Sequence, residues 1–89
     1  MESMYRKGLN KLANGLMERN IAFTFTAFMN GGKIDWGTCD AICHDGSYGG
    51  CCGLLEIMGD LVDKTKTMDT VEGFLTAEEI LNRIDEKGM

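Results

Sequence analysis

The segment IAFTFTAFMNGGKIDWG, residues 21–37, most constrains the fold, because an alternating apolar pattern and a turn signal occur in it together. Asn-Gly is the dipeptide favoured in a two-residue turn between antiparallel strands, and here it is Asn30-Gly31. A turn at that place predicts a hairpin in which Phe25 lies opposite Trp36. One face of the hairpin should then contain Phe23, Phe25, Ala27, Ile34 and Trp36. Helices are expected to cover this apolar face.

Helical periodicity occurs on both sides of the hairpin. Over residues 2–19 apolar side chains recur every three or four positions, which predicts a helix with one buried face. Asn20 suits the left-handed conformation that ends helices. A second helix is expected over residues 51–63. A third begins in LTAEEILNRI, where Thr76 and Glu79 have the spacing of a capping box.

Together these segments predict a single α+β domain over residues 1–89. Gly37-Thr38 should interrupt the second strand, because a straight continuation would bury Asp40 without a partner. CDAICH then forms a third short strand, and VEGFL packs as an extended piece. The predicted order is an N-terminal helix, a three-stranded antiparallel meander and two C-terminal helices packed on one face of the sheet.

Charge is distributed unevenly along the chain, whose formal net charge is −5. Residues 1–33 carry five Lys or Arg and two acids, whereas residues 34–89 carry four and twelve. A mainly acidic surface repels phosphate, so direct binding of nucleic acid is not expected. No apolar run has the length of a membrane span, and the first residues lack the apolar core of a secretory signal. These features predict a cytoplasmic protein that has reduced cysteines and does not contact a membrane.

The stretch CDAICHDGSYGGCCG, residues 39–53, contains all four cysteines and the only histidine. One hypothesis is a zinc- or thiol-dependent protein that uses Cys39, Cys43, His44 and Cys51, because thiolates and imidazoles are zinc ligands. The spacing is unfavourable, since Cys43 and His44 point to opposite faces of a strand. A second hypothesis makes Cys51 a nucleophile at the start of the predicted helix, with His44 as its base. The simpler interpretation treats Cys39, Cys43 and one of the adjacent pair as small buried apolar groups. It predicts no metal, no cofactor and no enzymatic activity.

The loop in this stretch is the predicted partner-binding site. His44, Asp45, Ser47 and Tyr48 are polar side chains on one anchored loop, and such loops often carry binding. A glycine-rich loop before a helix can also hold an anion. However, the Lys of a Walker loop is absent, and Asp45 would repel phosphate. The glycines are therefore expected to allow a chain reversal, and the loop to contact another protein.

A second candidate surface is the acidic C-terminal half of the chain. Asp60, Asp63, Glu78 and Glu79 are its representative carboxylates. Such carboxylates can imitate nucleic-acid phosphates in the basic groove of a host protein that handles DNA or RNA. Lys and Arg interrupt the acidic residues, so a solvated face is the alternative.

Three segments, CDAICHDGSYGG, GLLEIMG and VEGFLTAEEIL, resemble motifs in small proteins of bacteriophages and of integrated mobile elements of gut bacteria. The likeness covers the larger, C-terminal part of the chain and supplies no activity or binding residues. It implies a short accessory protein that binds a host protein, and some such proteins inhibit host defence nucleases. The favoured function is therefore a small acidic protein-interaction module that acts as a monomer or weak dimer.

Overall fold

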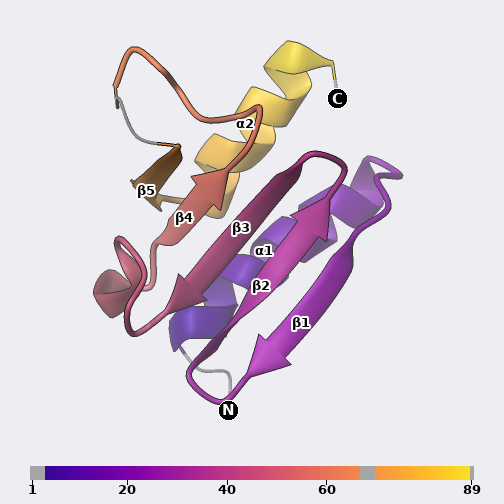
Figure 1. Cartoon of the computed structure of the whole chain (residues 1–89). Coiled ribbons are helices and arrows are strands. Elements are labelled where there is room, and N and C mark those ends of the chain that lie inside the picture. The colour runs from indigo at the N-terminus through magenta and orange to yellow at the C-terminus, as the bar shows by residue number, and fades with distance from the viewer. Residues whose placement is uncertain (1–3, 67–69, 89) are drawn as a thin grey trace.

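The computed structural model describes residues 4–66 and 70–88, which form a helix, a five-stranded antiparallel sheet and a second helix (Figure 1). The strand order is β1-β2-β3-β4-β5, so each strand pairs with its neighbours in sequence. The elements are α1 (Met4–Glu18), β1 (Thr24–Phe28), β2 (Gly31–Trp36), β3 (Cys39–His44), the 3₁₀ turn η1 (Gly50–Cys52), β4 (Leu55–Met58), β5 (Val71–Leu75) and α2 (Ala77–Lys87). Neither described helix is long and apolar enough to cross a membrane.

The α+β class and the first and last helices agree with the sequence, but the predicted three-stranded meander with two C-terminal helices is wrong. The segment predicted as a helix over residues 51–63 contains η1 and β4 instead. Gly53 and Gly59 have left-handed φ angles of 73° and 109° and enclose too few residues for a stable helix. Between them Leu55 and Ile57 are buried in alternation, which is the spacing of a strand. The extended piece VEGFL is β5, the fifth strand of the sheet.

The predicted hairpin is present, but its turn is one residue earlier than expected. The turn consists of residues 29–30, and Phe25 therefore lies opposite Ile34 rather than Trp36. Moving the turn by one residue changes each partner by two positions, so every side chain stays on its predicted face. Gly31 belongs to β2, where β3 passes too close for a side chain.

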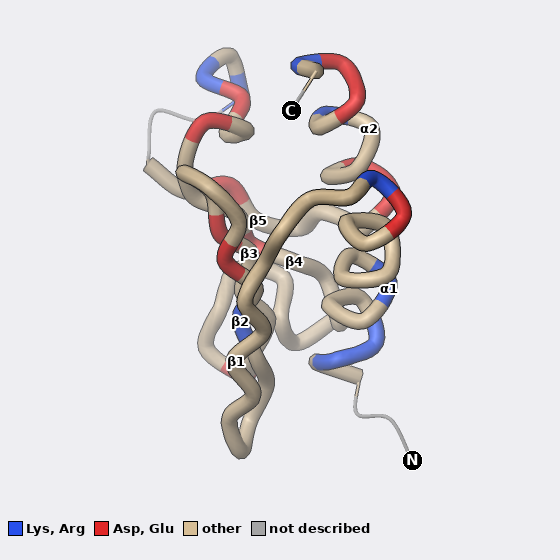
Figure 2. The backbone as a smooth tube through the Cα atoms, turned by 90° about the vertical axis from the view of Figure 1, so that its right-hand side faces the viewer, with Lys and Arg blue, Asp and Glu red and all other residues tan. Residues whose placement is uncertain are grey.

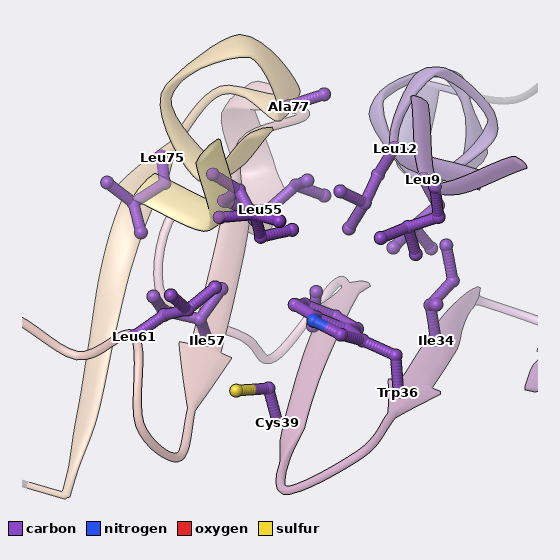
Figure 3. Close-up of a cluster of buried hydrophobic side chains, with 14 of the residues drawn as sticks. Leu9, Leu12, Ile34, Trp36, Cys39, Leu55, Ile57, Leu61, Leu75 and Ala77 are labelled. Atoms are coloured by element: carbon purple, nitrogen blue, oxygen red, sulfur yellow. The ribbon is translucent and has the colours of Figure 1, made fainter. Parts of the chain in front are cut away.

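The core lies between the two helices and one face of the sheet (Figure 3). α1 packs across β2 and β3 and beside α2. Phe23, Phe25 and Leu81 are part-buried against the core. Leu54 is only half-buried, whereas its neighbour Leu55 is fully buried. The large buried side chains are Leu9, Leu12, Leu16, Ile34, Trp36, Leu55, Ile57, Leu61, Leu75, Ile80 and Ile84.

The ends of the helices match the sequence signals. Asn20 has a φ of 58° and follows the end of α1. Thr76 Oγ1 accepts a hydrogen bond from Glu79 N at 3.1 Å, and Glu79 Oε1 accepts one from Thr76 N at 3.0 Å. The capping box is therefore complete, and it fixes the start of α2 directly after β5.

Both helices lie on the same side of the sheet, as the side view in Figure 2 shows. Gly15 lets α1 approach α2 closely, because a side chain at this position would collide with Leu81. Near the ends of the same helices Arg19 Nε donates to Asp85 Oδ1 at 2.8 Å. The opposite face of the sheet receives no helix among the described residues.

Candidate functional site: the uncovered face of the sheet

The outer face is the face of the sheet opposite the helices. It is formed by the side chains that alternate with core residues along each strand. Strand pairing aligns these side chains in rows that cross the sheet. The rows are Thr24, Asp35, Asp40, Met58 and Val71; then Thr26, Lys33, Ile42 and Glu56; then Phe28 and His44.

Three carboxylates lie near one another on the outer face. Asp35 and Asp40 are directly opposite each other in β2 and β3, where opposed Cβ atoms are about 5 Å apart. Burial raises the pKa of Asp40 above its ordinary value of 3.8, and the negative charges of Asp35 and Glu56 raise it further. Lys33 Nζ lies 3.7 Å from Asp35 Oδ2 and offsets part of this charge. Acidic positions lie on the sheet and also on the two helices, while the basic start of α1 lies on the helix side (Figure 2).

Apolar side chains lie among these carboxylates. Met58 is directly opposite Asp40 and is 45% exposed. Ile42 is half-buried and lies between Lys33 and Glu56 in the next row. A surface of this composition can bury apolar area against a partner while its charges select a basic one.

The predicted loop residues lie at one end of the outer face and have different roles. The His44 ring meets the Phe28 ring edge-on, with centroids 6.1 Å apart. Ser47 Oγ accepts a hydrogen bond from His44 N at 3.0 Å and donates one to His44 O at 2.9 Å, so this hydroxyl holds the loop together. Asp45 is exposed, and its Oδ1 accepts a hydrogen bond from Asn30 Nδ2 at 2.7 Å. This contact joins the loop to the β1–β2 turn.

Tyr48 is the exposed aromatic residue of this loop. It is 58% exposed, and its backbone N donates to Glu56 Oε1 at 2.8 Å. Its backbone O accepts from Phe74 N at 3.3 Å, and its side chain lies against Gly73. Phe74 is 60% exposed and has a φ of 60°, which no signal in the sequence indicated. Two exposed aromatic residues therefore lie beside one another where the loop meets β5.

The glycine-rich turn uses its backbone donors internally. Gly53 N donates to Gly50 O at 2.9 Å, and Leu54 N donates to Gly49 O at 2.9 Å. η1 has only three residues, so it lacks the aligned dipoles of a long helix. The helix start that would attract an anion, or activate Cys51, is absent.

The four cysteines occupy two different environments. Cys39 and Cys43 are 4% and 0% exposed and point into the core from β3, and burial raises the pKa of the Cys43 thiol. Cys51 and Cys52 are both exposed on η1, with their sulfur atoms 3.7 Å apart. The simpler interpretation is thus right for the first two residues and wrong for the adjacent pair. His44 and the cysteines do not form a cluster, and the described residues contain no group of three or more His, Cys, Asp or Glu placed to hold a metal.

Alkylation should separate these two environments. In the folded protein iodoacetamide should modify Cys51 and Cys52, because the reacting thiolate needs access to solvent. Cys39 and Cys43 should react only after unfolding. Intact mass spectrometry should therefore find two adducts under native conditions and four in denaturant. A variant with Ser at both exposed positions should take up none until it unfolds. Equal labelling rates at all four thiols would contradict the burial of β3 in the core.

The predicted acidic surface is divided between two places. Glu78 and Glu79 lie in the first turn of α2. Asp60 and Asp63 lie near its other end, where Lys87 Nζ donates to Asp60 O at 2.8 Å. About 12 Å of helix separates Glu79 from Lys87. These four carboxylates consequently do not form one continuous surface.

A cavity of about 240 Å³ lies between the starts of α1 and α2, on the helix side of the molecule. Lys7, Lys11, Cys52 and Glu78 are among its lining residues. It is smaller than the roughly 300–1,000 Å³ of most small-molecule sites. It therefore gives little support to a small-molecule ligand.

The outer face, with the exposed aromatic residues Tyr48 and Phe74 near one end of it, is thus the strongest candidate for a functional surface. No protein-family model matches the chain, and no curated protein or solved structure is significantly similar to it.

Proposed function

We propose that the protein is a protein-interaction module whose outer face binds a basic segment of a partner protein. The observation that carries this proposal is the opposition of Asp35 and Asp40 on the sheet face that no described helix covers (Figure 2). Like charges directly opposite one another destabilise a sheet, so the arrangement lowers the stability of the free protein. A Lys or Arg side chain from a partner would relieve that repulsion.

The apolar residues of the outer face define the rest of the partner's chemistry. Ile42 and Met58 lie beside the carboxylates and can bury the aliphatic stems of Lys or Arg. Tyr48 and Phe74 add exposed aromatic surface near one end of the face. A segment in which basic and aliphatic residues alternate would match both features.

Two other functions have weaker support. A zinc- or thiol-dependent activity would need Cys39, Cys43, His44 and Cys51 together, yet two of the three thiols lie in the core and the third on η1. Imitation of nucleic acid through the acidic C-terminal half would need a continuous acidic surface. If the partner handles nucleic acid, its phosphate-binding groove would more readily meet the outer face. The resemblance to phage and mobile-element proteins supports a host protein in the cytoplasm as the partner.

Asp40→Asn should weaken partner binding and stabilise the free protein. The probe for binding is a peptide of alternating Lys and Val, titrated into isotopically labelled protein and followed by NMR. Shifts should concentrate on Ile42, Met58 and their neighbours. The dissociation constant should rise in Asp40→Asn, and also when salt is raised from about 0.05 M to 0.5 M, which shortens the Debye length from roughly 14 Å to 4 Å. Asp85→Asn removes a carboxylate from the helix side and is the matched control, which should bind like the wild type.

The stabilisation expected from Asp40→Asn depends on pH. The pKa of Asp40 in the folded protein lies above its ordinary value of 3.8, so protonation of Asp40 stabilises the fold. This contribution is complete below pH 3.8 and is lost as the pH rises through the folded pKa. Asp40→Asn should match the wild type at low pH and exceed it by about 0.5 kcal/mol at neutral pH, since solvent screens this partly exposed group. Urea unfolding at both pH values measures the difference. Peptide shifts on α1, or binding that ignores both salt and Asp40→Asn, would contradict the proposed site.

A further inference from the structure

The two edges of the sheet differ in how they are protected. β5 forms one edge and carries Glu72, the left-handed Phe74 and a register shift against β4. Charges and irregular backbone are common devices that prevent pairing at an exposed edge. β1 forms the opposite edge in regular register, and its sequence TFTAF has no charge, proline or bulge (Figure 1). β1 is thus an unprotected edge.

The register of the hairpin identifies the backbone groups that β1 presents. A two-residue turn is flanked by a hydrogen-bonded pair, and such pairs alternate with non-hydrogen-bonded ones along the strands. Phe28, Thr26 and Thr24 therefore direct their backbone groups toward β2. The N–H and C=O groups of Phe25 and Ala27 face the free edge.

We propose that β1 is a self-association edge, and that it pairs antiparallel with β1 of a second copy of this chain about a two-fold axis at Thr26. In this register Phe25 lies opposite Ala27 of the second copy, and their free backbone groups form roughly four hydrogen bonds across the axis. A large side chain thus faces a small one on the core side of the joined sheet. On the outer face Phe28 lies opposite Thr24, again a large side chain against a small one.

Charge opposes pairing with a second copy least at this edge. Each copy has a net charge of −5, so two copies repel one another over most of their surfaces. β1 is the one strand among the described residues without a charged side chain, so repulsion is least there. Pairing of five-residue edges buries a small area, which corresponds to a weak, concentration-dependent dimer. The two outer faces would then be continuous, so the dimer would present two of the proposed basic-segment sites side by side.

Two variants test the edge without removing the pairing of β1 with β2. Ala27→Pro removes an N–H that faces the free edge, a position at which edge strands accept proline. Ala27→Val keeps that N–H and is its matched control. Thr26→Glu places a carboxylate opposite Lys33 of the same chain, which favours the fold. Across the two-fold axis the same carboxylate lies opposite its counterpart in the second copy, and this repulsion opposes the dimer. Thr26→Glu keeps the test decisive if the proline variant is poorly folded, and circular dichroism verifies each fold.

Sedimentation equilibrium from about 10 µM to 1 mM provides the measurement. The wild type and Ala27→Val should change from the monomer mass of 9.8 kDa toward twice that value as concentration rises. Ala27→Pro and Thr26→Glu should remain monomeric. A wild type that stays monomeric throughout this concentration range overturns the proposal. The edge of β1 would then face solvent or pair with a strand of another protein. A dimer that survives both variants overturns it as well, because another surface then joins the copies. Both outcomes are independent of the Lys-Val peptide titration.

Discussion

Glu72→Gln should lower the free energy of unfolding by about 2–3 kcal/mol, because it breaks a largely buried ion pair and leaves a guanidinium without its partner. Arg83 donates from Nη1 and Nη2 to the two carboxylate oxygens of Glu72, each at 2.7 Å, and the two side chains are 17% and 10% exposed. Glu72 Oε1 also accepts from Asp63 N at 2.9 Å, and Arg83 Nη1 donates to Leu61 O at 3.0 Å. The amide of Gln would turn an N–H₂ group toward these donors. Urea unfolding at neutral pH measures the loss.

The effect of Glu72→Gln should also depend on pH. The hydrogen bonds from Arg83 lower the pKa of Glu72 below its ordinary value of 4.5. The carboxylate therefore contributes stability above that pH, and the contribution is lost as the pH falls through the folded pKa. The difference between wild type and variant should shrink in acid. Asp85→Asn is the control. The side chains of Arg19 and Asp85 are 29% and 54% exposed, so their ion pair should contribute far less to the free energy of unfolding. Equal losses in the two variants would contradict the special role of the buried pair.

Gly31→Ala should lower the free energy of unfolding by about 3 kcal/mol, because β2 and β3 are too close at this point for a Cβ atom. The added atom would overlap Cys43 O and lie 2.8 Å from His44 Cα. Both are backbone atoms, so relief requires the strands to separate at the end where the His44 loop begins. Gly31 also has a φ of 152°, which L residues rarely adopt. Thermal unfolding followed by circular dichroism should show a melting temperature lower by about 15 °C.

Gly37→Ala is the matched control at the other end of β2. Gly37 also has a positive φ, of 57°, but a Cβ atom there would meet nothing within 4 Å. Its substitution should cost only the left-handed strain of a non-glycine residue, about 1 kcal/mol. A loss at Gly31 no larger than the loss at Gly37 would mean that close approach of β2 and β3 is not what requires glycine.

Signals among neighbouring residues correctly predicted the helix ends, because helix ends depend on local interactions. The capping box at Thr76 and Glu79 predicted the start of α2, and Asn20 predicted the end of α1. The helix predicted over residues 51–63 is wrong because the apolar residues of this segment satisfy two periods. Ile57 and Leu61 have helical spacing, while Leu55 and Ile57 have strand spacing. Pairing with β3 decides between these alternatives, and sequence periodicity alone does not contain that information.

The candidate site was predictable in part. Tyr48 and its loop were identified from polar residues on an anchored turn, and they lie at one end of the outer face. A signal for the acid pair was also present. A turn at Gly37-Thr38 places Asp35 opposite Asp40, so the predicted third strand already implied their opposition. The predicted helix over residues 51–63 gives no reason to place Met58 on this face.

The order of the elements has a consequence for how the chain folds. The strands pair in sequence order, so each hairpin can form from neighbouring residues as they are made. The core cannot form completely until α2 has been made, because α1 and α2 come from opposite ends of the described chain. The two helices meet where Gly15 faces Leu81. On the ribosome the sheet can therefore assemble before the layer that stabilises it is complete. Until α2 emerges, Leu55 and Ile57 lack part of their cover, and this interval is when a nascent chain is most exposed to chaperones, proteases and its own neighbours.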